Sequence, residues 1–367
     1  MRLSRLFACL ASTGILLLAL GGCATQPAGE AVDPSELVWP LPPEQPRIRF
    51  VRSLRSRDDI GATDEFDLTA VLLGEDDKPT GAALRKPYGV HADKDGRIFV
   101  ADTGWGRVLV FDLANQKFAI WGSEGRGALE KPAGIASDSQ GRIYVTDVEQ
   151  KRIVVYDRDG KFLYAMGRKG DLERPAGIAV DEARNRVFVT DVKRHNIAVF
   201  DMAGPLIATI GERGGEPGQF NFPTQLARGR DGKLYVMDQM NFRVQILDPE
   251  GNVLKVFGQI GDTAGSFARP KGIAVDSENN IYVVDAAFNK IQVFDQDGRL
   301  LLYLGSMGWN PGQFWLPAGA YIDEQDRLYV ADQYNKRVQV FQYLAEDSAA
   351  TAAEEPEAAA VPAQEAQ

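Results

Sequence analysis

One short pattern recurs six times between Lys86 and Gln342 and limits what this chain can fold into. The six copies are Lys86-Pro-Tyr-Gly-Val, Lys131-Pro-Ala-Gly-Ile, Arg174-Pro-Ala-Gly-Ile, Phe222-Pro-Thr-Gln-Leu, Arg269-Pro-Lys-Gly-Ile and Leu316-Pro-Ala-Gly-Ala. An aspartate follows each proline by 15 or 16 residues, at Asp102, Asp147, Asp191, Asp238, Asp285 and Asp332. A period of 44 to 47 residues indicates a propeller or another repeat array, in which neighbouring units bury a shared core.

Each complete repeat contains four short strand-like segments. In the fifth repeat, residues 272–276, 280–285, 290–295 and 299–305 are rich in β-branched and aromatic residues, and Gly, Asn and Asp separate them. Asp-Gly pairs such as Asp95-Gly96 lie between these segments, where tight hairpins need a positive φ. The sequence therefore predicts an all-β fold, a six-bladed β-propeller of four-stranded antiparallel blades.

The sixth repeat ends at Gln342 without a fourth strand of its own. Residues 46–54 precede the first repeat, and there Ile48 and Phe50 alternate with basic residues as in a strand. We expect this segment to supply the missing outer strand and to close the ring, which gives a propeller domain over residues 46–344. Residues 64–74 fit either a short helix or an alternative closing strand.

The first 22 residues have the features of a secretory signal. They contain Arg2 and Arg5, then a short apolar run, and small residues before Cys23. The run Leu-Gly-Gly-Cys that ends at Cys23 resembles a bacterial lipobox. That resemblance implies that fatty acids such as palmitate are attached at Cys23 and hold the protein on a membrane. An ordinary signal peptide with a cysteine nearby is the alternative.

Ala24, not aspartate, follows Cys23. By resemblance to Gram-negative lipoproteins, this favours the outer membrane and a periplasmic location. Residues 23–45 contain five prolines and are interpreted as a tether, and the Ala/Glu/Pro-rich residues 345–367 as a disordered tail. The other cysteine, Cys9, lies in the signal, so we expect no disulfide in the mature chain.

The net charge of the chain excludes one class of partner. At pH 7 it is −10, whereas nucleic-acid binding depends on clustered lysine and arginine. Export from the cytoplasm argues against nucleic acid as well, so a protein or glycan of the cell envelope is expected instead.

Basic residues flank the repeat prolines despite the acidic total, at Arg85, Lys86, Lys131, Arg174, Arg269 and Lys271. The repeat symmetry should gather them around one mouth of the channel, where they could steer an anionic ligand or a carboxylate-rich surface. The alternative is a solvated rim with acids interspersed.

The repeat aspartates, Asp102 to Asp332, could form a ring of carboxylates around a metal or a cationic ligand. They close a strand before a turn, however, where an aspartate accepts backbone N–H bonds. We interpret them as structural, and assign no metal site.

Departures from the repeat mark a second candidate site. Most copies have alanine two residues after the conserved glycine, but the first has His91 and the sixth has Tyr321. The fourth copy replaces the glycine by Gln225. The first and sixth blades are neighbours in a closed ring, so these polar residues could form a ligand site in the channel. Packing, or lining of a water-filled channel, is the alternative.

The runs 100–112 and 330–341 resemble the NHL repeat. This resemblance implies a six-bladed propeller and, in most members, a binding module, although a minority of related propellers are enzymes. Propeller lyases of similar fold hold zinc by several histidines, and this chain has only His91 and His195, which excludes such a site. Lactonase-type propellers are similar too, and hold calcium by carboxylate and amide oxygens.

The residues also show no assignable Ser-His-Asp or Cys-His arrangement. The sequence therefore predicts a lipid-anchored, non-catalytic binding or scaffolding module without a cofactor, for a protein or glycan partner in the envelope. The alternative is a calcium-dependent, lactonase-like hydrolase with its site in the central channel.

Overall fold

The computed structural model describes residues 37–62 and 83–344, which belong to one compact unit. Four of the sequence predictions lie outside the described residues. They are the signal, the lipid anchor at Cys23, the helix or strand at 64–74, and the tail at 345–367.

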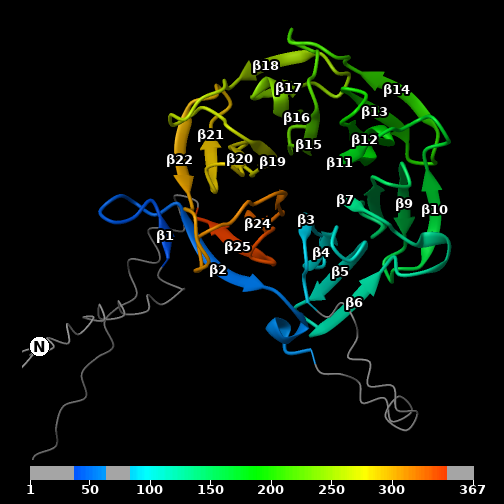
Figure 1. The fold of residues 1–367 in the computed structure, drawn as a ribbon, viewed down its shortest axis with the longest axis horizontal. Helices are drawn as coiled ribbons and strands as arrows, with labels where there is room; N and C mark the ends of the chain where they lie inside the picture. Colours follow the sequence, from blue (N-terminus) through cyan, green and yellow to red (C-terminus); the bar gives the residue numbers. More distant parts are fainter. Residues whose placement is uncertain (1–36, 63–82, 345–367) are drawn as a thin grey trace, which may run out of the picture. The chain divides into compact units, whose positions relative to one another are not determined.

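Five of the six blades are four-stranded antiparallel sheets whose strands follow one another in the chain (Figure 1). The first comprises β3 (Pro87–Ala92), β4 (Arg97–Asp102), β5 (Arg107–Asp112) and β6 (Lys117–Trp121). The second comprises β7 (Pro132–Ser137), β8 (Ile143–Asp147), β9 (Arg152–Tyr156) and β10 (Phe162–Met166). The third comprises β11 (Pro175–Asp181), β12 (Arg186–Asp191), β13 (Asn196–Asp201) and β14 (Leu206–Ile210).

The remaining blades complete the ring. The fourth comprises β15 (Pro223–Arg228), β16 (Leu234–Asp238), β17 (Arg243–Leu247) and β18 (Val253–Phe257). The fifth comprises β19 (Pro270–Val275), β20 (Ile281–Asp285), β21 (Lys290–Phe294) and β22 (Leu300–Leu304). The sixth combines β23 (Ala320–Ile322), β24 (Arg327–Asp332) and β25 (Arg337–Tyr343) with β1 (Val38–Trp39) and β2 (Ile48–Leu54). The predicted six-bladed propeller is confirmed.

The predicted closure by the N-terminal strand is confirmed as well. Strand β2 pairs with β25 in antiparallel register, with Phe50 opposite Phe341. The tether prediction, which extended to residue 45, is wrong at its end because Val38–Trp39 pair with β2 as a fifth strand. The physical reason is packing: the Trp39 ring lies against Phe341, with 5.7 Å between centroids.

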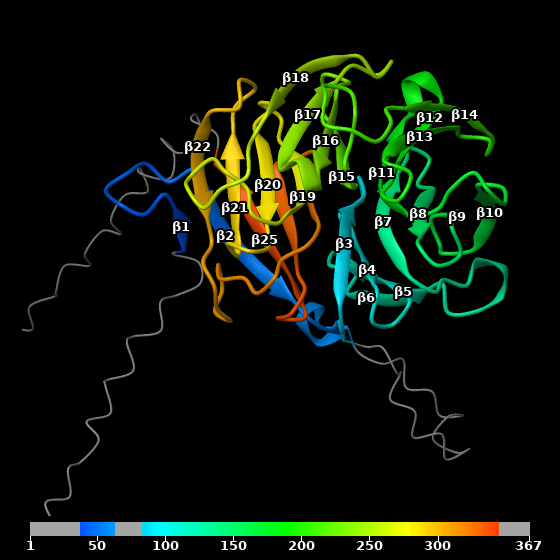
Figure 2. The ribbon, with the colours of Figure 1, turned by 45° about the horizontal axis from the view of Figure 1, so that its top comes forward.

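Successive blades share their hydrophobic cores, as the repeat pattern requires. Because side chains alternate along a strand, β4 packs in both directions. Ile98 and Val100 join a buried cluster with Tyr329 of the sixth blade, while Phe99 joins one with Ile143 of the second. Each blade therefore depends on both neighbours, and Figure 2 shows the sheets stacked side by side around the ring.

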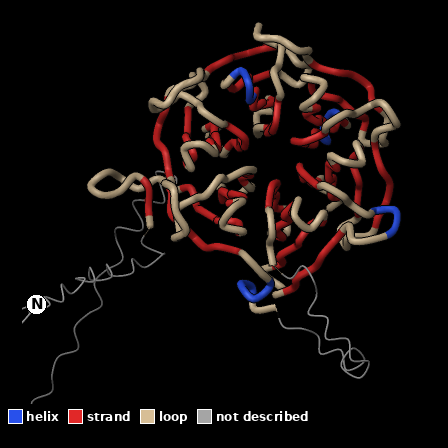
Figure 3. The backbone as a smooth tube through the Cα atoms, viewed as in Figure 1, coloured by secondary structure: helices blue, strands red, loops and turns tan. Residues whose placement is uncertain are grey.

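Strands account for nearly all regular structure in the described part of the chain (Figure 3). The helices there are short 3₁₀ turns: η2 (Arg57–Ile60), η3 (Gly125–Gly127), η4 (Glu182–Arg184) and η5 (Gln239–Asn241). Among these described residues, no helix has the length and apolar character needed to cross a bilayer.

The six inner strands approach one another closely enough to explain the glycine of the repeat. A Cβ atom added to Gly89 would lie 1.9 Å from the carbonyl oxygen of Ala133, and one on Gly134 would lie 2.3 Å from that of Ala176. Neither position can carry a side chain without moving backbone. The fourth blade, with Gln225 at this position, is therefore an exception that its surroundings must accommodate.

Candidate functional site

One face of the propeller collects the repeat cations and the six repeat aspartates. Because each blade is an antiparallel meander, its inner strand begins, and its second strand ends, at the same face. The repeat cations and the repeat aspartates therefore lie at this face, around the channel. A cavity of about 610 Å³ opens there, and we name it the basic mouth because five of the predicted rim cations line it: Lys86, Lys131, Arg174, Arg269 and Lys271.

Among the described residues, no carboxylate lines the basic mouth. Lys131 forms an exposed ion pair with Glu149, with 3.2 Å between Nζ and Oε1. Arg85, the sixth predicted rim residue, is exposed but is not part of the lining. Its guanidinium lies over the Trp105 ring, 5.2 Å from the centroid. The mouth is thus a concentration of positive charge on an acidic protein, which attracts anions.

The repeat aspartates lie behind this rim and hold its backbone. The Asp102 carboxylate accepts hydrogen bonds from the backbone nitrogens of Arg85 and Lys86 at 2.7 and 3.0 Å. Asp191 accepts from Arg174 N at 3.0 Å, and Asp285 from Arg269 N at 3.0 Å. The same contact recurs at the other three blades, where Asp147 accepts from Lys131 N, Asp238 from Asn221 N and Asp332 from Trp315 N.

All six aspartate residues are fully buried. A buried carboxylate is stable only when hydrogen-bonded or paired, and backbone N–H groups fulfil that need here. These hydrogen bonds give the aspartates a structural role.

The fourth and sixth blades lack a cation at the rim. In these blades, a side chain of the preceding blade accepts a hydrogen bond from the backbone N–H before the repeat proline. His195 Nδ1 accepts a hydrogen bond from Phe222 N at 3.2 Å, and Asn289 Oδ1 accepts one from Leu316 N at 2.7 Å. Both acceptors come from the preceding blade. His195 therefore joins the third blade to the fourth.

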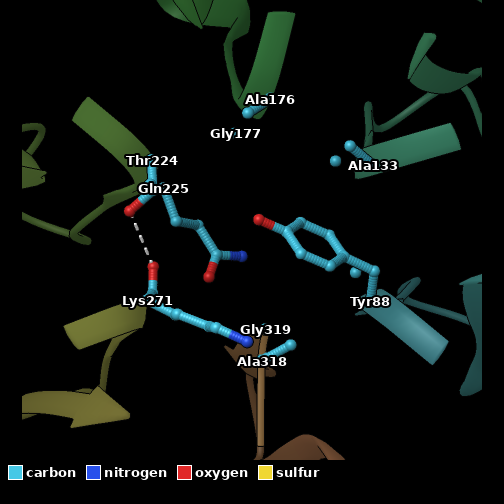
Figure 4. Close-up of a pocket in the computed structure, with 11 residues that line it drawn as sticks. Tyr88, Ala133, Ala176, Gly177, Thr224, Gln225, Lys271, Ala318 and Gly319 are labelled. Carbon is cyan, nitrogen blue, oxygen red and sulfur yellow. Dashed lines mark hydrogen bonds between the residues drawn. The ribbon is translucent and has the colours of Figure 1, made fainter. Parts of the chain in front are cut away.

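Beneath the basic mouth the channel narrows to a constriction with a free volume of about 10 Å³. The residue after the repeat proline lines it in every blade: Tyr88, Ala133, Ala176, Thr224, Lys271 and Ala318. Three of these are alanine. The side chain of Tyr88 instead extends across the channel toward that of Gln225, and the side chain of Lys271 extends into the channel toward Gly319 and Ala318 (Figure 4).

The protonation states of the constriction follow from its burial. Desolvation, assisted by the charges of Arg269 and Lys86, lowers the pKa of Lys271 to about 8. Burial raises the pKa of the Tyr88 hydroxyl, an effect that the charge of Arg174 opposes. At pH 7, Lys271 is therefore mainly a cation and Tyr88 a neutral hydroxyl.

A second cavity, of about 180 Å³, lies beyond the constriction. The predicted cluster of His91, Gln225 and Tyr321 lines it together with Ser137 and Arg228, among other residues. The His91 and Tyr321 rings are in contact, with 4.2 Å between centroids, and His91 Nε2 lies 2.7 Å from Ser137 Oγ. Burial lowers the pKa of His91 to about 3, so this histidine is neutral at physiological pH.

Sequence reasoning brought His91, Gln225 and Tyr321 together but missed Tyr88, and it placed Lys271 only on the rim. The overlooked signal is the variable position of the repeat, which reads Tyr, Ala, Ala, Thr, Lys and Ala from the first copy to the sixth. A packed core would have no room for large side chains at a position that is usually alanine. In a closed propeller, such side chains must therefore extend into the central channel.

The channel does not fit a calcium ion. Calcium takes six to eight oxygen ligands, usually with carboxylates among them. The constriction supplies only neutral oxygens and carries Lys271. Within residues 37–62 and 83–344, no group of three or more His, Cys, Asp or Glu is arranged to hold a metal.

Family models match most of the repeats. The NHL repeat model matches residues 129–156, 172–200 and 314–341, and a model described as a 6-bladed beta-propeller matches residues 224–302. Fold and sequence together define a six-bladed β-propeller. Three of its repeats match the NHL repeat model.

Solved structures of similar fold have diverse roles. A gluconolactonase from Xanthomonas campestris is 18% identical, with a TM-score of 0.55 over 71% of this chain and 86% of that chain. A propeller in a nidogen/laminin complex is 21% identical, with a TM-score of 0.52 over 67% and 84%. Virginiamycin B lyase from Staphylococcus aureus is 16% identical, with a TM-score of 0.53 over 70% and 94%. At these identities the likeness concerns the fold alone.

A comparison with curated proteins gave no match.

The low pKa of His91 makes the stability of the propeller sensitive to acid. In the unfolded chain the histidine pKa is about 6.5, so below that pH the unfolded state binds a proton that the folded state rejects. Stability should therefore fall from pH 6.5 toward pH 3, by up to about 1.4 kcal/mol per pH unit. His91→Gln should flatten this dependence in urea unfolding between pH 6.5 and 5.

Tyr321→Phe is the matched control, because it alters the neighbouring ring but leaves the imidazole in place. It should keep the wild-type slope. Equal slopes for His91→Gln and wild type would contradict the assignment of a buried neutral histidine.

Proposed function

We propose that this propeller is a non-catalytic binding or scaffolding module that receives an anionic group of a protein or glycan partner in its basic mouth. The supporting observation is the cavity of about 610 Å³ lined by five cations without a carboxylate among the described residues. A surface of one sign raises the local concentration of the opposite charge and speeds association. The fixed backbone behind the rim makes this surface preorganised, which reduces the cost of ordering on binding.

A hydrolytic role has weaker support. His91 and Ser137 form the one contact between a potential base and a hydroxyl nucleophile that the described channel offers. A general base works best with a pKa near the operating pH, and burial lowers the pKa of His91 to about 3. The calcium-dependent, lactonase-like alternative has similarity of fold in its favour, but the donors in the channel do not suit calcium.

The location of the module is part of the proposal. The lipobox-like run ending at Cys23 supports acylation and attachment to a membrane, and Ala24 supports the outer membrane. Such an anchor would hold the propeller in the periplasm, where an envelope protein or glycan would be its partner.

Reversing charge in the mouth should weaken binding of anionic polymers. We expect the pair Arg174→Glu and Arg269→Glu to reduce affinity for immobilised poly-glutamate and polygalacturonate by about tenfold or more. The measurement is biolayer interferometry on the full-length protein in detergent, at low and at physiological salt, because added salt should weaken the wild-type signal.

The control pair is Lys94→Glu with Lys161→Glu, which makes the same change in net charge at exposed hairpins of the opposite face. Binding by this pair should stay close to wild type. An equal loss in both pairs would mean that net charge, and not the basic mouth, governs binding.

Removing the lipidation cysteine should free the protein from membranes. Cys23→Ser should move it from the membrane fraction to the soluble fraction of lysed cells, since acyl chains stabilise membrane binding by roughly 0.8 kcal/mol per buried CH₂. Cys9→Ser is the control and should leave the distribution unchanged. Membrane association that survives Cys23→Ser would remove the anchor from the proposal.

A further inference from the structure

The constriction of the channel combines three side chains that carry hydrogen-bond donors with the methyl groups of three alanines. The side chains of Tyr88, Gln225 and Lys271 extend into it from the first, fourth and fifth blades (Figure 4). Ala133, Ala176 and Ala318 of the remaining blades complete the ring. The donors therefore come from opposite sides of the channel, where Tyr88 faces Gln225 (Figure 4).

Hydrogen-bond donors of the constriction are available to a ligand, because neighbouring oxygen acceptors already accept hydrogen bonds from other groups. Gln225 Oε1 accepts a hydrogen bond from Ile273 N at 3.3 Å, which leaves the amide nitrogen of Gln225 for the channel. Thr224 Oγ1 donates to the carbonyl oxygen of Lys271 at 3.0 Å. No carboxylate of the described residues lines the constriction, and no ion pair of theirs engages Lys271.

We propose that the constriction is a receptor for one carboxylate group, held by the Lys271 ammonium, the Tyr88 hydroxyl and the Gln225 amide nitrogen. The free volume of about 10 Å³ admits a group of only a few atoms. A planar carboxylate with one negative charge matches one ammonium and two neutral donors. A tetrahedral phosphate is bulkier and carries more charge.

The rest of the ligand would occupy the basic mouth, which is continuous with the constriction through Tyr88, Thr224 and Lys271. This inference rests on the proposed function and specifies a carboxylate as the anionic group that the basic mouth would receive. A sugar acid and the carboxyl end of a peptide share that chemistry. The cationic rim would guide either one inward, and the carboxylate would lodge at the narrowest point.

A positive charge at this depth is unfavourable in the empty channel, and an anion would compensate it. The groups around Lys271 are Lys86, Arg269 and Tyr88, with Lys131 and Arg174 farther around the mouth. The charges of Arg269 and Lys86 disfavour a proton on Lys271. A bound carboxylate would raise the pKa of Lys271 from about 8, so binding takes up a proton in alkaline solution. Affinity should therefore fall by about tenfold at pH 9 relative to pH 7.

Calorimetric titration of the full-length protein in detergent tests this site with two small acids, glucuronate and N-acetylalanine. We expect at least one of them to bind, while its methyl ester does not. Lys271→Met should reduce affinity by about tenfold or more, and Tyr88→Phe by a smaller factor. Lys290→Met is the matched control, a half-buried lysine that lies over the Tyr303 ring and should leave affinity unchanged.

The identity of the acid that binds distinguishes a sugar acid from a peptide end. Ester binding equal to acid binding, or affinity unaltered by Lys271→Met and by pH 9, would overturn the carboxylate receptor. Should Lys271→Met fail to fold, Tyr88→Phe and the pH dependence of the wild type give the same decision.

The two proposals fail separately. If the Arg174→Glu and Arg269→Glu pair abolishes polymer binding while neither acid binds wild type, the basic mouth stands and the constriction receptor falls. If an acid binds through Lys271 but the polymers ignore the charge reversal, the receptor stands and the proposed mouth function falls.

Discussion

The rest of the structure depends on the hydrogen bonds between each buried repeat aspartate and the backbone just before the inner strand of the same blade. Each carboxylate loses its water on burial and recovers hydrogen bonds from two or more N–H groups in most blades, as Asp102 does from Arg85 and Lys86. The contact fixes where an inner strand starts and therefore where its first side chains point. Because the same residues carry the rim cations, the fold-stabilising contact also positions the charges of the basic mouth.

Close approach of the inner strands then leaves few places for chemistry. The glycine that follows the variable residue in five of the repeats has no room for a Cβ atom, as Gly89 shows against Ala133. Large polar side chains can line the channel only where the repeat tolerates them. These places are the variable position and the position two residues beyond the glycine. Tyr88 and Lys271 use the first of these positions, and His91 and Tyr321 use the second. Asymmetry among six similar blades thus gives the channel its two distinct cavities.

Most of this architecture can be predicted from the sequence because the repeat carries it. The period, the paired prolines and aspartates, and the missing strand of the sixth blade predict the ring and its closure by residues 46–54. The pairing of β1 with β2 could not be foreseen, since the proline-rich segment around Trp39 gives no strand period and the ring contact with Phe341 is tertiary. Adjacency of the first and sixth blades predicts the approach of His91 to Tyr321. Whether Tyr88, Gln225 and Lys271 meet depends on the width of the channel, and no local pattern encodes that width.

At the inner end of the basic mouth, the constriction is proposed to bind the carboxylate of an anionic ligand. A crystal structure of the protein with glucuronate tests this most directly. The account predicts density for the sugar in the basic mouth, with its carboxylate within hydrogen-bonding distance of Lys271 Nζ, the Tyr88 hydroxyl and the Gln225 amide nitrogen. Density confined to the cavity of His91 and Tyr321, or an empty constriction at saturating glucuronate, would contradict it.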